Sequence, residues 1–318
     1  MDLLDKDFGL RIIHENEEQT VYSIDTDHSS SRMIRYHLYP GIDMILSDFK
    51  ERYVWSGEWK LKESVYQISY NRRGVYQAQL SKNEFCYASP GNLILLNGCK
   101  KSLDSKMTTD VLQGFSILLF PDQLDQCLAE QWQRQFDLDV CHMLHILPGT
   151  EEARAFSCGE GIHRVAEEIY HHLYNHEMGM VRLKLLEFFH MLINEDVRIE
   201  HRQRVFSREQ IEKTKMIKNL MEMDLSKHYT IEELCKNYEL SATIFKQCFK
   251  SMFQYPPYEF LRVARMNQAG EYLRHSDMSI LEISKSLGYE NPSNFSRTFK
   301  AIYGVLPSEY RYSDEKNV

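Results

Sequence analysis

The chain has 318 residues, a mass of 37.7 kDa and a formal net charge of −8. Hydrophobic residues make up 43% and charged residues 26%, as in globular proteins, so wholesale disorder and fibrous folds are excluded. No uncharged apolar run approaches the ~20 residues of a membrane-spanning helix. The acidic start, residues 1–7, lacks the pattern of a signal peptide. We therefore expect a cytoplasmic protein of two domains with no membrane partner.

The cysteines favour a reducing compartment. Their number is odd and no two have Cys-x-x-Cys spacing, so neither a disulfide framework nor a zinc ribbon is expected. Most lie in apolar patterns, which predicts inert core positions. The seven are Cys86, Cys99, Cys127, Cys141, Cys158, Cys235 and Cys248.

Residues 1–150 are predicted to form a β-rich domain. Between about Met33 and Phe120, short alternating runs such as 64–70 and 92–96 are separated by turn residues such as Pro40-Gly41. Several short strands at this spacing predict an antiparallel sandwich or barrel.

Residues 151–195 switch to helical periodicity and predict a helical hairpin. In its second half, Val181, Leu185, Phe188 and Phe189 fall on one face. This apolar stripe is either intradomain core or part of a dimer interface, and we favour a shared role. The polar residues 196–208 predict a linker to a C-terminal domain at 209–313.

Histidines on the hairpin raise the question of a metal site. His171, His172 and His176 are close in sequence, and Glu168 precedes His171 with Glu-x-x-His spacing. We favour a solvated polar face over a metal site, because a metal would also need ligands from elsewhere in the fold, and we interpret His142 and His145 in the same way.

An enzyme of the cupin type would need a His-x-His motif with a Glu and a further His. Residues 33–120 contain only His37. We therefore predict no catalytic residue, no metal and no cofactor. The alternative function is a cupin-type metalloenzyme with an attached DNA-targeting domain.

The C-terminal domain repeats itself. Thr230-Ile231-Glu232-Glu233-Leu234 matches Ser279-Ile280-Leu281-Glu282-Ile283, and Phe249-Lys250 matches Phe299-Lys300. Each copy begins with a hydroxyl residue followed three positions later by Glu, which is a helix-capping box. A turn and a second helix follow, beginning near Ser241 and Pro292. The repeat predicts two helix-turn-helix units.

The second helix of each unit combines a buried face with a polar face that lacks carboxylates. The predicted buried faces are Phe245, Cys248, Phe249 and Met252 in the first unit and Phe295, Phe299 and Ile302 in the second. The exposed donors predict contacts to DNA bases and phosphates. They are Thr243, Lys246, Gln247, Lys250, Ser293, Asn294, Arg297 and Lys300.

The two units are joined by a predicted helix at 257–275. At ~1.5 Å per residue it spans ~28 Å, which with its flanking turns is about one ~34 Å turn of B-DNA. Two recognition helices could therefore enter successive major grooves. From Phe206 onward, 16 Lys and Arg balance 15 Asp and Glu, so the negative charge belongs to the rest of the chain. An acidic N-terminal part argues against non-selective DNA binding.

Residues 211–311 closely resemble the DNA-binding domain of the AraC/XylS family of bacterial transcription regulators. The motifs are Gly288-Tyr289, the run 294–300, Tyr303-Gly304 and the run 307–311. The resemblance implies the two recognition helices and the contact residues above. Glu239 and Gln254 replace glycines that are common in the family, and at left-handed positions each would cost ~1 kcal/mol.

The N-terminal part resembles the family's cupin-like sensor domain only in its pattern, and this resemblance implies an antiparallel, jelly-roll-like β-barrel, so we expect an α+β fold for the whole chain. The resemblance implies a small effector, homodimerisation, or both, and contact with RNA polymerase if the protein is an activator. Aromatic and arginine side chains of the predicted strands are candidates for an effector pocket. They are Trp55, Tyr66, Arg72 and Tyr76.

Overall fold

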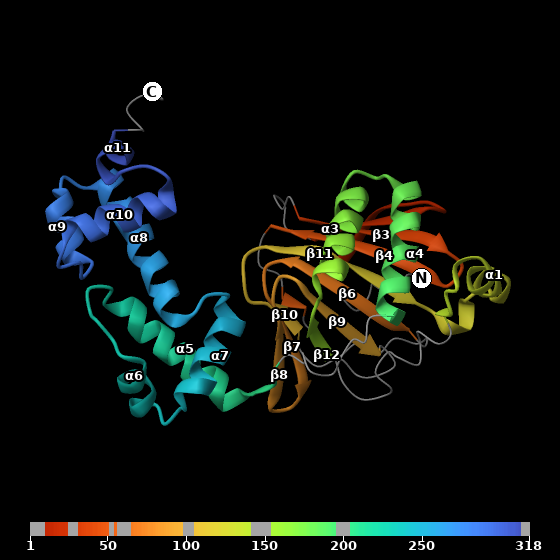
Figure 1. Ribbon diagram of the computed structural model, residues 1–318, viewed down its shortest axis with the longest axis horizontal. Helices are drawn as coiled ribbons and strands as arrows, with labels where there is room; N and C mark the ends of the chain where they lie inside the picture. The colour runs from red at the N-terminus through yellow and green to blue at the C-terminus, as the bar shows by residue number, and fades with distance from the viewer. Residues whose placement is uncertain are drawn as a thin grey trace. The chain divides into compact units, whose positions relative to one another are not determined.

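The computed structural model describes residues 10–24, 31–50, 54–55, 65–97, 105–140, 154–194 and 204–312. The chain divides into two compact units, Met1–Ser207 and Arg208–Val318. The first combines antiparallel sheets with helices and the second is helical (Figure 1). An α+β chain with a helical C-terminal unit is therefore confirmed.

The strands of the N-terminal unit form two antiparallel sheets. The larger has the order β1 (Leu10–Glu15), β2 (Gln19–Ile24), β3 (Arg32–Tyr39), β4 (Ile42–Phe49), β11 (Leu112–Leu119), β6 (Tyr66–Arg73), β9 (Asn92–Asn97) and β12 (Arg154–Ser157). The smaller has the order β13 (Phe206–Ser207), β8 (Glu84–Ala88), β7 (Tyr76–Ser81), β10 (Ser105–Met107) and β5 (Val54–Trp55). Within the described residues neither sheet closes on itself, so a closed barrel is not confirmed.

Alternation along the strands separates two cores. Ile34 and Tyr36 of β3 pack in the core beneath the helices, whereas Met33 packs in a second core with Met107 of the smaller sheet. Neighbouring residues of a strand point to opposite faces, so one strand contributes to both cores. Gly41 forms the turn between β3 and β4 with φ +79°. An added Cβ there would lie 2.7 Å from the backbone nitrogen of Leu124, so the turn requires glycine.

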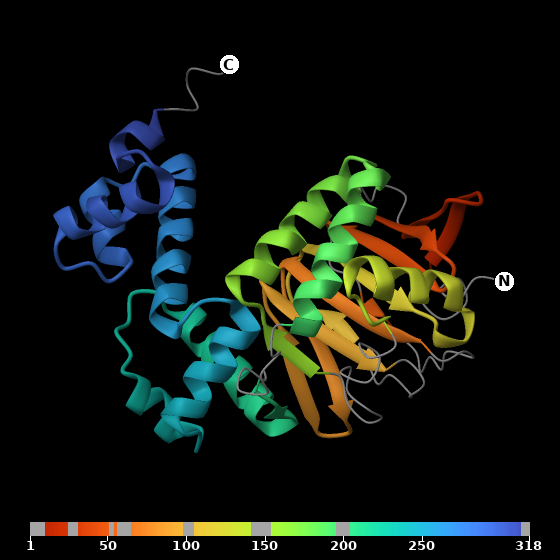
Figure 2. The same ribbon diagram turned by 45° about the vertical axis from the view of Figure 1, so that its right-hand side comes forward.

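Two long helices cover one face of the larger sheet (Figure 2). They are α3 (Glu160–Tyr174) and α4 (Met178–Asn194), which form the predicted hairpin. A short 3-10 helix, η1 (Pro121–Gln123), and α1 (Gln126–Phe136) precede them. The stripe predicted as core or dimer interface is core: Val181, Leu185, Phe188 and Phe189 are all 0% exposed within one chain.

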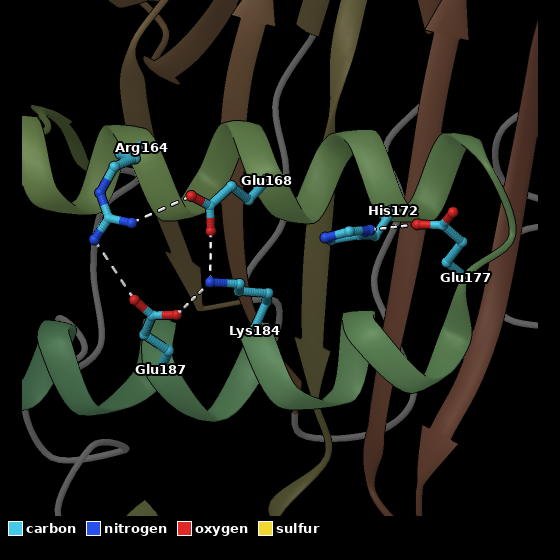
Figure 3. A network of polar contacts seen from close by, with 6 residues as sticks. All are labelled: Arg164, Glu168, His172, Glu177, Lys184 and Glu187. Atoms are coloured by element: carbon cyan, nitrogen blue, oxygen red, sulfur yellow. Dashed lines mark hydrogen bonds and ion pairs between the residues drawn. The ribbon is translucent and has the colours of Figure 1, made fainter.

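An ion-pair network joins the outer sides of the hairpin (Figure 3). Lys184 Nζ on α4 lies 2.6 Å from Glu168 Oε2 on α3 and 2.8 Å from Glu187 Oε2. Arg164 pairs with Glu168 and Glu187. Hydrogen bonds from Lys184 hold the pKa of Glu168 below its usual value, and those same bonds raise the pKa of Lys184. The network ties α3 to α4 over the apolar core.

Some N-terminal elements differ from the prediction. β1 and β2 precede the predicted start of the strands, and α1 is a helix within the region expected to be β-rich. β12 opens the predicted hairpin region but pairs with β9. β13 lies in the predicted linker, where Phe206 is 1% exposed and contacts Tyr87. Pairing with strands that are distant in sequence determines the conformation of the short strands, because isolated short segments have weak conformational preferences of their own.

The C-terminal unit contains seven helices within its described residues. They are α5 (Arg208–Met223), α6 (Ile231–Asn237), α7 (Ala242–Phe253), α8 (Pro257–His275), α9 (Ile280–Ser286), α10 (Pro292–Tyr303) and α11 (Pro307–Arg311). One core lies among α5, α6, α7 and the start of α8, and a second lies among α8, α9 and α10. Since α8 contributes Leu261 to the first core and Leu273 to the second, it joins two helix-turn-helix units into one body.

Candidate nucleic-acid interface

Both helix-turn-helix units begin with the predicted capping box. The backbone N–H of Glu233 donates to Thr230 Oγ1 (3.1 Å), and the N–H of Thr230 donates back to Glu233 Oε2 (3.0 Å). Ser279 and Glu282 repeat the arrangement at 3.2 and 2.7 Å. These hydrogen bonds to the charged carboxylates lower the pKa of Glu233 and Glu282. The first helices, α6 and α9, are therefore fixed at their start by the same device.

The turns and helix ends of the two units share a left-handed backbone but differ in residue type. Glu239 (φ 51°) and Gln254 (φ 70°) in the first unit correspond to Gly288 (φ 76°) and Gly304 (φ 79°) in the second. The predicted strain at Glu239 and Gln254 is therefore present, because a side chain disfavours this conformation. The first unit carries conformational strain that the second avoids.

Replacing Gln254 with glycine should raise the free energy of unfolding of the C-terminal unit by about 1 kcal/mol, because the left-handed residue loses its steric penalty. Gly304→Ala is the matched opposite change: an added Cβ there meets nothing within 4 Å, so only backbone strain is introduced. It should lower stability by a similar amount. Urea unfolding of the full chain would measure both, and a destabilised Gln254→Gly variant would contradict the strain.

The first recognition helix, α7, has the predicted division of faces. Phe245, Cys248, Phe249 and Met252 are buried. All four predicted DNA-contacting side chains are exposed: Thr243, Lys246, Gln247 and Lys250. Ser241 caps the helix by accepting a hydrogen bond from the N–H of Ile244 (3.2 Å).

The second recognition helix, α10, repeats this division with one difference. Phe295 and Phe299 are buried, but Ile302 is 36% exposed, so its predicted place in the buried face is wrong. Ile302 lies three positions beyond Phe299, and the next residue, Tyr303, packs against Phe299 and Tyr310 in its place. The exposed polar residues are those predicted: Ser293, Asn294, Arg297 and Lys300. Arg297 Nη2 donates to Asn294 Oδ1 at 2.9 Å.

Charge pairing distinguishes these two faces from the rest of the unit. On α5, Lys213, Lys215 and Lys218 each pair with a glutamate three or four positions away. On α7 and α10 there is no acidic residue. Within the described residues, Lys246 and Lys300 form no ion pair, and the same is true of Lys250 and Arg297. Their charges therefore remain available to an anionic partner.

The histidines of the hairpin have separate partners. His172 Nδ1 lies 2.5 Å from Glu177 Oε2, His176 Nδ1 lies 2.9 Å from the Tyr36 hydroxyl, and His171 contacts Asn175. No group of three or more metal-ligating side chains comes together in the part of the chain that the structure describes. His142 and His145 lie outside the described residues. His37 contacts Asp43, which pairs with buried Arg35 at 2.6 Å.

The cysteines follow the core prediction in part. Cys86, Cys235 and Cys248 are buried, and burial raises the pKa of the Cys248 thiol to about 11. Cys127 on α1 is exposed, and Cys158 is half-buried. Cys99 and Cys141 lie outside the described residues.

Of the four candidate effector residues, Tyr66 and Tyr76 belong to different cores. Tyr66 packs against the core beneath α3 and α4, whereas Tyr76 packs against the core between the sheets. Arg72 is exposed; its Nε donates to Glu167 Oε2 at 2.8 Å and its guanidinium lies 4.7 Å from the Tyr170 ring. The backbone of Trp55 lies in β5, and its side chain is outside the described residues.

A polar cluster that the sequence analysis overlooked lies on the sheet face opposite α3 and α4. Gln67 Nε2 donates to Ser69 Oγ (2.8 Å) and Ser116 Oγ (3.1 Å), and the two hydroxyls lie 2.8 Å apart. The alternation of Gln67 and Ser69 with Ile68 and Tyr70 was the available signal, because it places uncharged polar groups on an inner strand face.

None of the described helices is both long enough and apolar enough to cross a bilayer.

Comparison with known proteins concerns mainly the C-terminal unit. Residues 234–313 match the helix-turn-helix domain family. The lactose operon transcription activator of Staphylococcus xylosus is 33% identical over 86 residues, 27% of this chain and 31% of that protein. Regulatory protein PocR of Salmonella typhimurium is 33% identical over 106 residues, 33% of this chain and 35% of that protein. The chain thus spans about a third of the length of the curated relatives it matches.

Solved structures with similarity include the DNA-binding domain of AdpA in complex with a target DNA. It is 23% identical, with a TM-score of 0.31, and the alignment covers 33% of this chain and 96% of that chain. ToxT from Vibrio cholerae is 15% identical, with a TM-score of 0.32, over 87% of this chain and 96% of that chain.

The family match contains both recognition helices, and the matched relatives are named transcriptional regulators. The C-terminal unit of this chain is therefore a double helix-turn-helix domain of the AraC type.

Proposed function

We propose that this protein is a sequence-specific, DNA-binding transcription regulator of the cytoplasm. The observation that carries the proposal is the pair of corresponding helices, α7 and α10, whose exposed faces hold cations without carboxylate partners. Such faces suit phosphates and the acceptor-rich edges of bases in the major groove. The regulators matched over this unit support the proposal.

The contacts are assigned by chemistry. Lys246, Lys250 and Lys300 supply point charges for phosphates. Arg297 can donate two hydrogen bonds to one guanine. Thr243, Gln247, Ser293 and Asn294 supply hydrogen-bonding groups.

Selective DNA binding is the direct test. The full chain should shift promoter fragments from upstream of its own and adjacent genes, and affinity should fall steeply as salt rises because bound counterions are released. Lys246→Gln should weaken binding to all sequences similarly and reduce the salt slope by about 1. Lys285→Gln, an exposed change on α9, is the control. Salt-insensitive binding, or no sequence preference, would count against the proposal.

For the N-terminal unit we propose a cupin-like sensor that binds a small polar effector. The cluster of Gln67, Ser69 and Ser116 supports this, since it presents uncharged donors and acceptors on an inner sheet face. Thermal-shift screening of small metabolites tests it: an effector should raise the melting temperature of the wild type but not of Ser116→Val.

Homodimerisation through the hairpin is also proposed. Leu183 and Met180 are three positions apart on α4 and are 61% and 40% exposed, so they place two large apolar side chains on one exposed side of the helix. A dimer would let two C-terminal units bind paired sites. RNA polymerase is the proposed further partner if the output is activation. The proposal includes no catalytic step.

A further inference from the structure

Arg265 on α8 is a buried cation held by backbone carbonyls. It is 8% exposed, and its Nε and Nη2 donate to the carbonyl oxygens of Leu225 (2.7 Å) and Lys227 (3.0 Å). Burial lowers its pKa. The negative charge of Asp224 also acts on the guanidinium, but its direct partners are these two carbonyl oxygens, whose hydrogen bonds offset part of the cost of desolvating the charge. Both carbonyls belong to the loop 224–230 that joins α5 to the first helix-turn-helix unit.

The same loop contacts the turn of the second unit. His228 Nε2 lies 2.9 Å from the Gly288 carbonyl oxygen. A Cβ added to Gly288 would lie 2.2 Å from the Ser226 carbonyl oxygen, so loop and turn are in direct contact. Leu225 packs against the cores of both units.

Arg265 also faces the second unit. Its guanidinium carbon lies 5.8 Å from the centre of the Tyr289 ring, and that ring packs edge-on against Phe295 of α10. One buried side chain therefore connects the loop before the first unit with the turn that leads into the second recognition helix.

The spatial relation of the recognition helices matters because both must fit grooves of one duplex. If α8 were the sole connection, bending or twisting at its ends would change the distance between α7 and α10. The contact through Arg265, the loop 224–230 and Gly288-Tyr289 adds a second connection. A rigid pair of binding elements gains affinity only when its geometry matches its target.

We infer that Arg265 is a positioning residue, which clamps the loop 224–230 onto the turn of the second unit and thereby sets the half-site spacing that the protein accepts. The inference rests on the proposed DNA-binding function. Arg265 acts on DNA binding only through the position of the two recognition helices, without contacting DNA itself.

The first test needs no DNA. Fluorophores placed at positions 250 and 300 of the full chain through non-natural amino acids would report the distance between α7 and α10. The wild type should show one narrow distribution. Arg265→Lys keeps a charge but cannot present the planar fork that reaches both carbonyls, so its distribution should broaden. Arg262→Lys, an exposed change on the same helix beside Glu259, should leave it narrow. An unchanged distribution in Arg265→Lys would overturn the inference.

The second test uses bipartite DNA sites with the spacing changed by one base pair in either direction. The wild type should prefer the natural spacing by about tenfold, and Arg265→Lys should reduce that preference to about threefold or less, with unchanged affinity for a single half-site. Equal weakening at every spacing would show a merely structural role. If the wild type bound no DNA selectively, the proposed function would be wrong. The distance measurement between α7 and α10 would still test whether Arg265 positions the two units.

Gly288→Ala should loosen the contact between the loop 224–230 and the turn of the second unit without changing Arg265, because the added Cβ would push against the Ser226 carbonyl. Gly304→Ala shares the positive φ but lacks the contact, so it controls for backbone strain. Gly288→Ala should reproduce the broad distance distribution, whereas Gly304→Ala should not. A narrow distribution in Gly288→Ala would contradict the clamp.

Discussion

Phe249→Ala should lower the free energy of unfolding of the C-terminal unit by about 3–5 kcal/mol, because it removes a fully buried aromatic ring and leaves a cavity. Phe249 is 0% exposed, and its ring contacts those of Phe245, Phe253 and Phe260 at centroid distances of 5.4, 4.7 and 5.3 Å. It joins the first recognition helix to α8, so the loss affects the packing that positions α7.

The measurement is urea unfolding of the full chain, with hydrogen exchange of α7 amides to identify the unit that opens. Lys250→Ala is the matched control: it changes the next residue on the exposed face and should alter stability by less than about 0.5 kcal/mol. If Phe249→Ala lowered the free energy of unfolding by no more than Lys250→Ala, the aromatic cluster would not be what stabilises the unit.

Arg297→Ala should cost about 1–3 kcal/mol of binding free energy at the preferred site and relax selectivity at one base pair. The reason is geometric. Asn294 Oδ1 accepts a hydrogen bond from Arg297 Nη2, and this bond holds the guanidinium on the exposed face of α10. The hydrogen bond to Asn294 uses only one of the guanidinium nitrogens. A pre-oriented guanidinium loses less entropy when it binds the O6 and N7 atoms of guanine.

The effect should be read from binding titrations against a set of sites that differ at single positions. Asn294→Ala should give a smaller loss at the same base pair, since Arg297 remains but is less well held. Lys285→Ala, on the exposed side of α9, should leave selectivity unchanged. Selectivity that survives in Arg297→Ala would remove the guanine contact while leaving the fold unaffected.

Local signals predicted the C-terminal unit well. Capping boxes, the spacing of Phe245 and Phe249, and the turn positions at Glu239 and Gln254 all depend on residues a few positions apart, and the structure contains each of them. Ile302 shows where periodicity stops being informative. It has the spacing of a core residue, but at the end of α10 the side chain that packs against the core is that of Tyr303, which contacts Phe299 and Tyr310.

The N-terminal unit depends on partners that are distant in sequence. Two short segments, β12 and β13, have little preference for strand conformation of their own. Pairing of β12 with β9 and of β13 with β8 determines that they are strands. Arg72 pairs with Glu167, which lies far along the chain on α3, so the sequence around Arg72 did not reveal this partner. Arg265 went unnoticed for the same reason: its partners Leu225 and Lys227 lie about forty residues earlier.

Hydroxyl-radical footprinting on a selected binding site would report where each of the two recognition helices meets the duplex. We predict two protected patches on one face of the DNA, separated by about 10 base pairs, with the first lost in Lys246→Ala/Gln247→Ala and the second lost in Asn294→Ala/Arg297→Ala. A single patch, or protection that none of these substitutions alters, would show that α7 and α10 do not both bind DNA through these faces.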